Sequence, residues 1–220
     1  MMRRLALAAC SLAVPLLLAA IGVRLLASGP FLRLVYGRPG FPAAEGFDAA
    51  ERLALALPST RFIVNDAPPA ELAALRHAGA PLYSADEIAH LVDVRRVVRR
   101  LGQLASAFGL WLVLVGLAAR RGGWLAAWAR SLARGGWLTL TAVLLLVPAL
   151  ALSFDLAFTR FHQLLFEPGT WQFSDDSGLI RLFPERFWYD SGLAACATLV
   201  AGGLVVALVA GRMAAALERR

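Results

Sequence analysis

Two histidines are the side chains best suited to acid–base chemistry in this sequence, because each has acids at helical spacing. His90 has Asp86 four residues before it and Asp93 three residues after it. His162 has Asp155 seven residues before it, on the same face of a helix. A carboxylate that holds one imidazole nitrogen raises the basicity of the other. The spacing is typical of a pair of general bases with orienting acids, and equally of amphipathic residues at a membrane interface.

Aromatic side chains gather around His162 in a short, charged segment that lies between two apolar stretches. Trp171 and Phe173 follow a Pro-Gly turn in the middle of this segment, where we expect them to line a pocket rather than to anchor the chain to a bilayer. Phe161 and Phe166 flank the histidine itself. The four rings are therefore predicted to form a pocket wall.

The composition is that of a membrane protein. Hydrophobic residues make up 59% of the 220 residues and the mean hydropathy is +0.65, whereas soluble domains are about 45–50% apolar. All 22 basic residues are arginines that cluster at the ends of apolar stretches, so bilayer orientation accounts for the net charge of +7 and no nucleic-acid partner is expected. The predicted fold class is an α-helical integral membrane protein, with four transmembrane helices and a small α+β extracytoplasmic cap.

The apolar stretches divide the sequence into segments. The predicted transmembrane helices lie at 5–27, at the end of an amphipathic helix over 86–119, at 137–158 and at 187–211. The other predicted segments are an extracytoplasmic cap at 28–85, a cytoplasmic basic loop at 120–136, an extracytoplasmic motif loop at 159–186 and a cytoplasmic tail at 212–220.

The cap should contain both strands and helices. The apolar, aromatic run at 31–36 and the segment 61–65 are predicted to be strands. Asp48 with Glu51 three residues later predicts the start of a helix, which we expect to end before Pro58.

Ser84 and Glu87 form a capping-box pattern at the start of the 86–119 helix. Glu87 lies three residues before His90 on one helix face, so it is predicted to support that histidine together with the neighbouring aspartates. Anionic headgroups or a phosphate-bearing ligand are the predicted contacts of the arginines that follow, Arg95, Arg96 and Arg99.

Charge predicts the orientation of the chain. The N-terminus, the 120–136 loop and the C-terminal tail together hold nine arginines and one acid, Glu218. By the positive-inside rule both termini are cytoplasmic, and the cap and His90 and His162 face outward from a bacterial cytoplasmic membrane.

The sequence contains no glycine-rich phosphate loop, no Gly-x-Ser-x-Gly nucleophile motif and no closely spaced metal ligands. Cys10 and Cys196 both fall within apolar spans, so neither a disulfide nor a metal site is expected there. We therefore predict no metal and no cofactor.

The combined motifs resemble those of one family. They read Ser84-x-x-Glu87-x-x-His90-x-x-Asp93-Val94, then Phe161-His162-x-x-x-Phe166, Gly169-Thr170-Trp171-x-Phe173 and Leu179-Ile180-x-Leu182-Phe183-Pro184. In a chain with four spans, these two blocks resemble the lipoprotein intramolecular transacylase family of bacterial membrane proteins.

That resemblance implies a reaction. Members of the family move the sn-2 acyl chain of a diacylglyceryl lipoprotein onto the α-amine of its own N-terminal cysteine, which yields a lyso-form lipoprotein. His90 and His162 match the catalytic pair, diacylglyceryl lipoproteins and membrane lipid are the implied partners, and no metal or cofactor is implied. Which histidine acts as the base stays open.

Two other functions are compatible with the residues. A non-catalytic membrane protein whose cap binds a partner would keep His90 and His162 as interface residues. A metal-dependent membrane hydrolase would use both histidines and an acid as ligands, without the tight His-x-x-x-His pairing that such sites often show.

Overall fold

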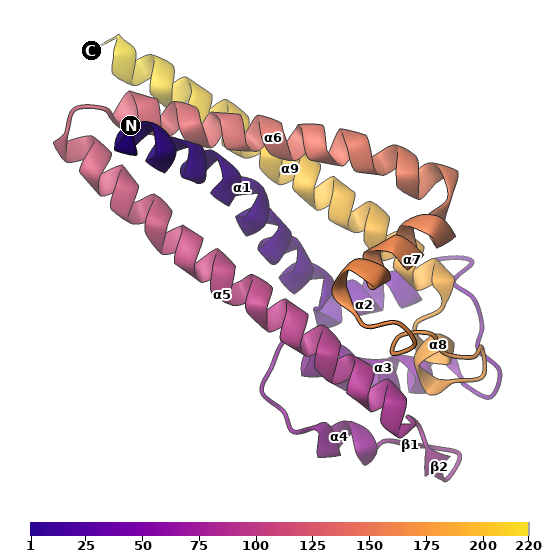
Figure 1. Cartoon of the computed structure of the whole chain (residues 1–220). Coiled ribbons are helices and arrows are strands. Elements are labelled where there is room, and N and C mark those ends of the chain that lie inside the picture. The colour runs from indigo at the N-terminus through magenta and orange to yellow at the C-terminus, as the bar shows by residue number, and fades with distance from the viewer. Residues whose placement is uncertain (220) are drawn as a thin grey trace. The chain divides into compact units, whose positions relative to one another are not determined.

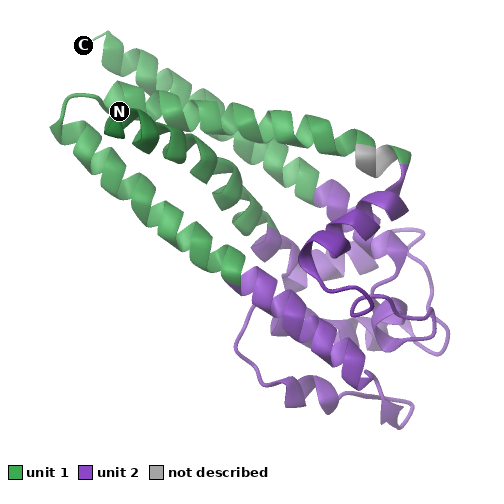
Figure 2. Cartoon of the chain, viewed as in Figure 1, with its two compact units in different colours: residues 1–22, 100–152, 195–220 green, residues 23–99, 153–194 purple. Residues whose placement is uncertain are grey.

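The computed structural model describes residues 1–148 and 152–219, and Figure 1 shows the order of its elements. The helices and strands are α1 (Met2–Leu26), α2 (Gly29–Tyr36), α3 (Ala49–Phe62), α4 (Pro69–Ala73), β1 (Arg76–His77), β2 (Ala80–Pro81), α5 (Ala85–Arg121), α6 (Leu125–Leu152), α7 (Phe154–Leu165), α8 (Gly178–Leu182) and α9 (Glu185–Glu218). Figure 2 divides the chain into two compact units. Unit 1 takes residues 1–22, 100–152 and 195 onward, and unit 2 takes residues 23–99 and 153–194.

Four of the helices are long and apolar enough to cross a membrane, as the sequence predicts. They are α1, α5, the Leu125–Pro148 part of α6, and α9. Two of them are longer than expected, because α5 extends to Arg121 and α9 begins at Glu185 and continues to Glu218.

The predicted basic loop at 120–136 is wrong, because only residues 122–124 separate α5 from α6. Gly135 and Gly136, which favour a loop, instead allow helices to pack closely within unit 1. A Cβ on Gly135 would lie 2.6 Å from the Ser11 carbonyl oxygen, and one on Gly136 would lie 2.6 Å from the Ala207 nitrogen. Small residues at such contacts are typical of packed membrane helices.

The predicted span at 137–158 is also wrong beyond Leu152, where α6 ends. Ser153 begins a new helix, since its Oγ accepts a hydrogen bond from the Leu156 nitrogen at 3.3 Å. The segment predicted as a motif loop therefore contains the second half of α7 and all of α8.

Both strands predicted in the cap are wrong. The run at 31–36 belongs to α2, whose first turn is set by Pro30 and by Ser28, which accepts a hydrogen bond from the Phe31 nitrogen at 3.3 Å. Its buried side chains, Leu32 and Val35, have helical spacing.

The helix that Asp48 caps does begin as predicted, with the Glu51 nitrogen donating to the Asp48 carboxylate at 2.8 Å. It continues through Pro58 to Phe62, so the predicted stop is wrong. Proline removes one backbone hydrogen bond, and burial of Phe62 and its neighbours on the same helix outweighs that loss.

The β-structure described in unit 2 is a hairpin of two residues per strand. Arg76 pairs with Pro81 and His77 with Ala80, around a turn at Ala78 and Gly79 in which both residues have positive φ. Unit 2 is thus mostly helical, and the predicted α+β cap is corrected accordingly.

The core of unit 2 packs the beginning of α5 against elements that come before it and after it in the sequence. Its buried members are Leu32, Val35, Ala56, Phe62, Leu72, Leu82, Tyr83, Leu91, Leu179, Leu182, Phe183 and Phe187. This core holds the first turns of α5 against α8 and the first turn of α9, and so fixes the segment that carries His90.

Candidate functional site

The first turn of α5 is closed by the predicted capping box. The Ser84 nitrogen donates to Glu87 Oε2 at 2.7 Å, and the Glu87 nitrogen donates to Ser84 Oγ at 3.2 Å. The second carboxylate oxygen of Glu87 accepts a hydrogen bond from the Leu179 nitrogen at 2.7 Å. Glu87 is only 3% exposed, so one buried carboxylate ties the start of α5 to the start of α8.

The same junction depends on Gly178, the first residue of α8. A Cβ at this position would lie 2.0 Å from the Leu82 carbonyl oxygen, so a side chain there would separate the two backbones. Ser177 caps α8 by accepting a hydrogen bond from the Ile180 nitrogen at 3.3 Å. The loop between α7 and α8 is therefore anchored beside the helix that carries His90.

His162 lies on α7 and is 7% exposed. Its Nδ1 is 2.8 Å from the Phe158 carbonyl oxygen, one turn earlier on the same helix. A carbonyl oxygen only accepts hydrogen bonds, so Nδ1 carries the proton and the lone pair of the neutral ring is on Nε2.

The structure brings His90 and His162 together within unit 2. Their ring centroids are 6.2 Å apart and their planes meet at 27°. His90, on the second turn of α5, is 6% exposed. The two rings come from helices that are far apart in the sequence, and both are nearly sealed from solvent.

Aromatic rings surround the two imidazoles, and all four predicted pocket-wall residues are among them. Phe166 lies between the histidines, 5.0 Å from His90 and 5.6 Å from His162 between centroids. Phe173 is 5.6 Å from His90, while Trp171 and Phe161 are 4.8 and 5.5 Å from His162. Phe158 adds a ring 4.0 Å from His162 that the sequence interpretation did not single out.

Burial keeps both histidines neutral. Asp93 and four arginines separate His90 from the apolar part of α5 that begins at Leu101, so this histidine lies outside the membrane-spanning segment. Burial, together with the neighbouring His162, lowers the pKa of His90 from 6.5 to about 4. Burial also lowers the pKa of His162, and the hydrogen bond to the Phe158 carbonyl partly opposes that shift.

The aspartates predicted to orient the two imidazole rings are either exposed or paired with another side chain. The Phe158 carbonyl, and not Asp155, is the partner of His162 Nδ1, and Asp155 is exposed. Asp93 is paired with Arg96 and acts on His90 only through its charge, which slightly opposes the lowering of the pKa. Asp86 is exposed on the first turn of α5. No distinctive feature of the sequence pointed to Phe158, because every residue inside a helix has a carbonyl four positions before it.

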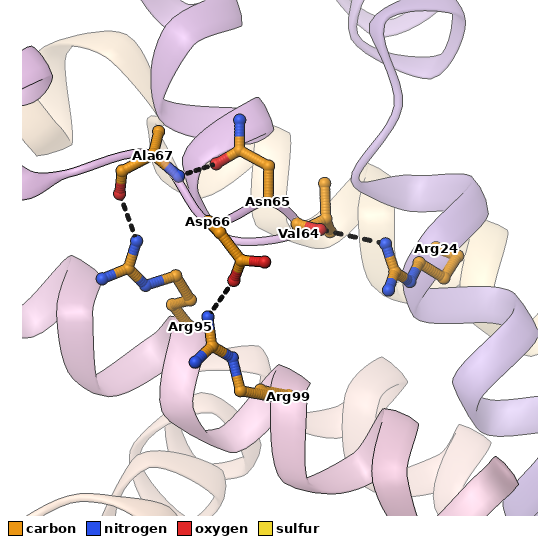
Figure 3. A network of polar contacts seen from close by, with 7 residues as sticks. All are labelled: Arg24, Val64, Asn65, Asp66, Ala67, Arg95 and Arg99. Carbon is orange, nitrogen blue, oxygen red and sulfur yellow. Dashed lines mark hydrogen bonds and ion pairs between the residues drawn. The ribbon is translucent and has the colours of Figure 1, made fainter.

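The three arginines predicted to contact phosphate are bound to the protein itself. Arg95 donates to the Ala67 carbonyl oxygen at 2.5 Å and lies over the Phe62 ring at 4.0 Å. Arg99 pairs with Asp66, as Figure 3 shows, and Arg96 pairs with Asp93.

Arg24 of α1 completes this set of contacts by donating to the Val64 carbonyl oxygen at 3.1 Å (Figure 3). Together, Arg24, Arg95 and Arg99 hold the segment between α3 and α4 against α1 and α5. Their role in the structure is therefore to fix this loop of unit 2.

Two buried nitrogens at the site have no hydrogen-bond partner within the described chain. They are Nδ1 of His90 and the indole Nε1 of Trp171. Buried polar atoms are almost always paired, so these two are available to a bound molecule. Within the described residues, no three His, Cys, Asp or Glu side chains are placed to hold a metal ion.

The sequence model of the lipoprotein intramolecular transacylase Lit matches residues 7–188. The chain belongs to the lipoprotein intramolecular transacylase family. It is an integral membrane protein with several spans, as the four long apolar helices and the solved relatives of the same fold indicate.

Solved structures of the membrane integral Lit from Bacillus cereus share the transacylase fold. One has a TM-score of 0.69 at 17% identity, covering 99% of this chain and 98% of that one. Two others, in which a histidine of that protein is replaced by arginine or alanine, have TM-scores of 0.60 at 17% identity, with 99% of this chain and 94% and 96% of those chains covered. An uncharacterised protein of Aquifex aeolicus (strain VF5) is 26% identical over 177 residues, which are 79% of this chain and 78% of that one.

Proposed function

We propose that this transacylase moves the sn-2 acyl chain of a diacylglyceryl lipoprotein onto the α-amine of the lipoprotein's own N-terminal cysteine. The observation that carries the proposal is the pair of neutral, buried imidazoles, 6.2 Å apart inside an aromatic cluster. Aromatic walls suit an acyl chain, and an imidazole without charge can accept the proton that an amine must lose.

His162 is the base in this mechanism. Its Nδ1 is held by the Phe158 carbonyl, so the lone pair on Nε2 is the one presented to substrate. The α-amine has an ordinary pKa of about 7.7–8.0, so its neutral fraction, which has released one proton to water, is the nucleophile. His162 takes the second proton, which the nitrogen must lose as it bonds to the acyl carbon.

The bonds change as follows. The amine nitrogen attacks the sn-2 ester carbon, the carbonyl π electrons move to oxygen, and the amine proton passes to His162 Nε2. The oxyanion then reforms the carbonyl, the bond from carbon to the sn-2 glycerol oxygen breaks, and that oxygen takes the proton from the imidazolium. The products are an amide on the cysteine and a free sn-2 hydroxyl, with His162 returned to its neutral form.

His90 is the second partner. It stays neutral at physiological pH, and its unpartnered Nδ1 can hydrogen-bond the substrate. Because the amine and the ester belong to one molecule, holding them together in a confined site supplies much of the acceleration.

The proposed location is the outer face of a bacterial cytoplasmic membrane. The nine arginines of the termini and of the 120–136 segment support a cytoplasmic location for those parts by the positive-inside rule, with unit 2 outside. The proposed partners are diacylglyceryl lipoproteins and the lipid around them.

Mass spectrometry of a lipoprotein labelled with deuterium in its sn-2 acyl chain tests the function. The purified protein in proteoliposomes should move the label to the cysteine nitrogen with no change in total mass. His162→Ala and His90→Ala should lose this activity, while His77→Ala, in a hairpin outside the site, should keep it. Full activity in both site variants would remove the histidines from the reaction, and loss of activity on adding a chelator would favour the metal-dependent hydrolase.

A further inference from the structure

Trp171 has a buried indole N–H with no acceptor within the described chain, and its ring lies 4.8 Å from that of His162. Leaving such a donor unpaired costs about 1–3 kcal/mol, so it calls for an explanation. Trp188, in the same unit, shows the ordinary arrangement, because its indole N–H donates to the Phe183 carbonyl oxygen at 3.0 Å. A missing hydrogen bond at the Trp171 indole would be tolerated if the substrate supplied the acceptor.

An unpaired indole nitrogen alone is not enough for this conclusion. Trp128 in unit 1 also has one, at a packing position where its ring is 3.0 Å from a Cβ placed on Gly116. Trp171 differs because its neighbour is the histidine proposed as the base. The unpaired indole N–H of Trp171 therefore lies at the site where acyl transfer is proposed to occur.

Besides His90, whose Nδ1 can hydrogen-bond the substrate, the transfer calls for a donor at the acyl carbonyl oxygen. When the amine attacks the ester, negative charge develops on the acyl carbonyl oxygen, and hydrogen-bond donors at that oxygen lower the barrier. The arginines nearest in sequence to His90, Arg95 and Arg96, are bonded to Ala67 and Asp93. Neither of these two guanidiniums is therefore assigned to the oxyanion, and His162 is occupied with the amine proton.

We propose that the Trp171 indole N–H donates a hydrogen bond to the oxyanion that forms on the sn-2 acyl carbonyl. The inference rests on the proposed function and names a further catalytic residue for it. This hydrogen bond changes none of the covalent steps, because the indole keeps its proton and the amine proton still passes to His162. The hydrogen bond from the indole N–H strengthens only while the acyl oxygen bears negative charge.

The loop that carries Trp171 is held before substrate binds. Thr170 is bonded to the Glu167 carbonyl oxygen through both its nitrogen (3.3 Å) and its Oγ1 (2.9 Å), and Gly169 supplies the turn with a φ of 83°. A donor fixed in this way stabilises the developing charge without reorganising during the reaction.

Two variants at this position remove the donor. Trp171→Phe keeps an aromatic ring, and 3-benzothienylalanine at position 171 keeps the shape of the indole while replacing its N–H with sulfur. With the deuterium-labelled lipoprotein in proteoliposomes, each should lower kcat about 10²–10³-fold and leave KM nearly unchanged, as expected for an interaction made only in the transition state. The pH dependence of kcat should not move, because the base is still His162.

Trp188→Phe is the matched control, since it also removes an indole N–H but one already bonded to the protein. It should lower the melting temperature and keep kcat. A folded benzothienylalanine protein with parental kcat, or a loss confined to KM, would overturn the inference alone. A parent that forms no lyso-form lipoprotein would overturn the proposed function, and the inference with it.

Discussion

The two histidines at the site differ in what holds them. The Phe158 carbonyl fixes the tautomer of His162, whereas Nδ1 of His90 has no partner in the described chain. Both rings are buried among aromatic side chains, which disfavours their charged forms. A site of this kind offers neutral imidazoles to the substrate at physiological pH.

Burial of His90 makes stability depend on pH. Its pKa is about 4 in the folded protein and about 6.5 in an unfolded chain. Between these values the unfolded chain binds a proton that the folded protein does not, so the free energy of unfolding must fall as pH is lowered from 6.5 towards 4. Melting temperatures in detergent should follow this trend, with a smaller decrease in His90→Gln than in the parent. The same decrease in both proteins would contradict the assignment.

Residue types and position predicted side chains that the structure brings together, but not what each contacts. His90 and His162 were recognisable from acids at helical spacing, and Trp171 and Phe173 from their position beside a Pro-Gly turn. The partner of His162 was not, since any helical residue has a carbonyl four positions before it, and an acid was the more conspicuous candidate. The contacts of Arg95 and Arg99 depend on a loop far away in the sequence, which no local pattern specifies.

At the scale of elements, a single side chain joins α5 to α8. Glu87 closes the first turn of α5 and reaches the Leu179 nitrogen, so the segment that carries His90 is joined to α8 by one buried carboxylate. The capping box was readable from Ser84 and Glu87, while the bond to Leu179 required the fold.

Glu87→Ala should leave two backbone N–H groups without their acceptor, the buried one of Leu179 and the part-buried one of Ser84. We expect a loss of about 2–4 kcal/mol in the free energy of unfolding, seen as a lower melting temperature in detergent, together with slower acyl transfer. Glu87→Gln should fall in between, because its amide oxygen can serve one of the two donors. Asp86→Ala, an exposed acid in the same turn, is the control, and equal stability of Asp86→Ala and Glu87→Ala would refute the role of Glu87.

Helices were predicted more successfully than their ends. The aromatic run at 31–36 looked like a strand because Phe, Val and Tyr favour strands, yet Ser28 and Pro30 begin a helix there and burial of one face maintains it. A helix end before Pro58 and a loop up to residue 136 were expected, and packing keeps the helix in both places. Tertiary contacts decided each case.

At the scale of the whole molecule, the two units are stabilised by different chemistry. Unit 1 packs helices through small residues, with Ser11 Oγ donating to the Ser131 carbonyl oxygen at 2.8 Å. Unit 2 has a core of aliphatic and aromatic side chains. His90 and His162 both belong to unit 2. Such a division suits a protein that exposes one part to lipid and uses another to hold a reacting headgroup.

The charge distribution predicts that unit 2 faces outward. In a background with Cys10→Ala and Cys196→Ala, a membrane-impermeant maleimide should label Ala43→Cys in intact cells. Arg121→Cys, exposed at the end of α5, should be labelled only after the membrane is opened. Labelling of position 121 in intact cells would reverse the proposed orientation.

The central claim is that His90 and His162 act together on one acyl transfer. Single-turnover rates of lyso-form lipoprotein formation in proteoliposomes test it, with the parent, His90→Gln, His162→Gln and the double variant. Each single variant should be slower by about 10²–10⁴-fold, and the double variant should be no slower than the more impaired single one, because groups that act as a unit are not additive. Losses that multiply in the double variant, or a single variant at the parental rate, would contradict the claim.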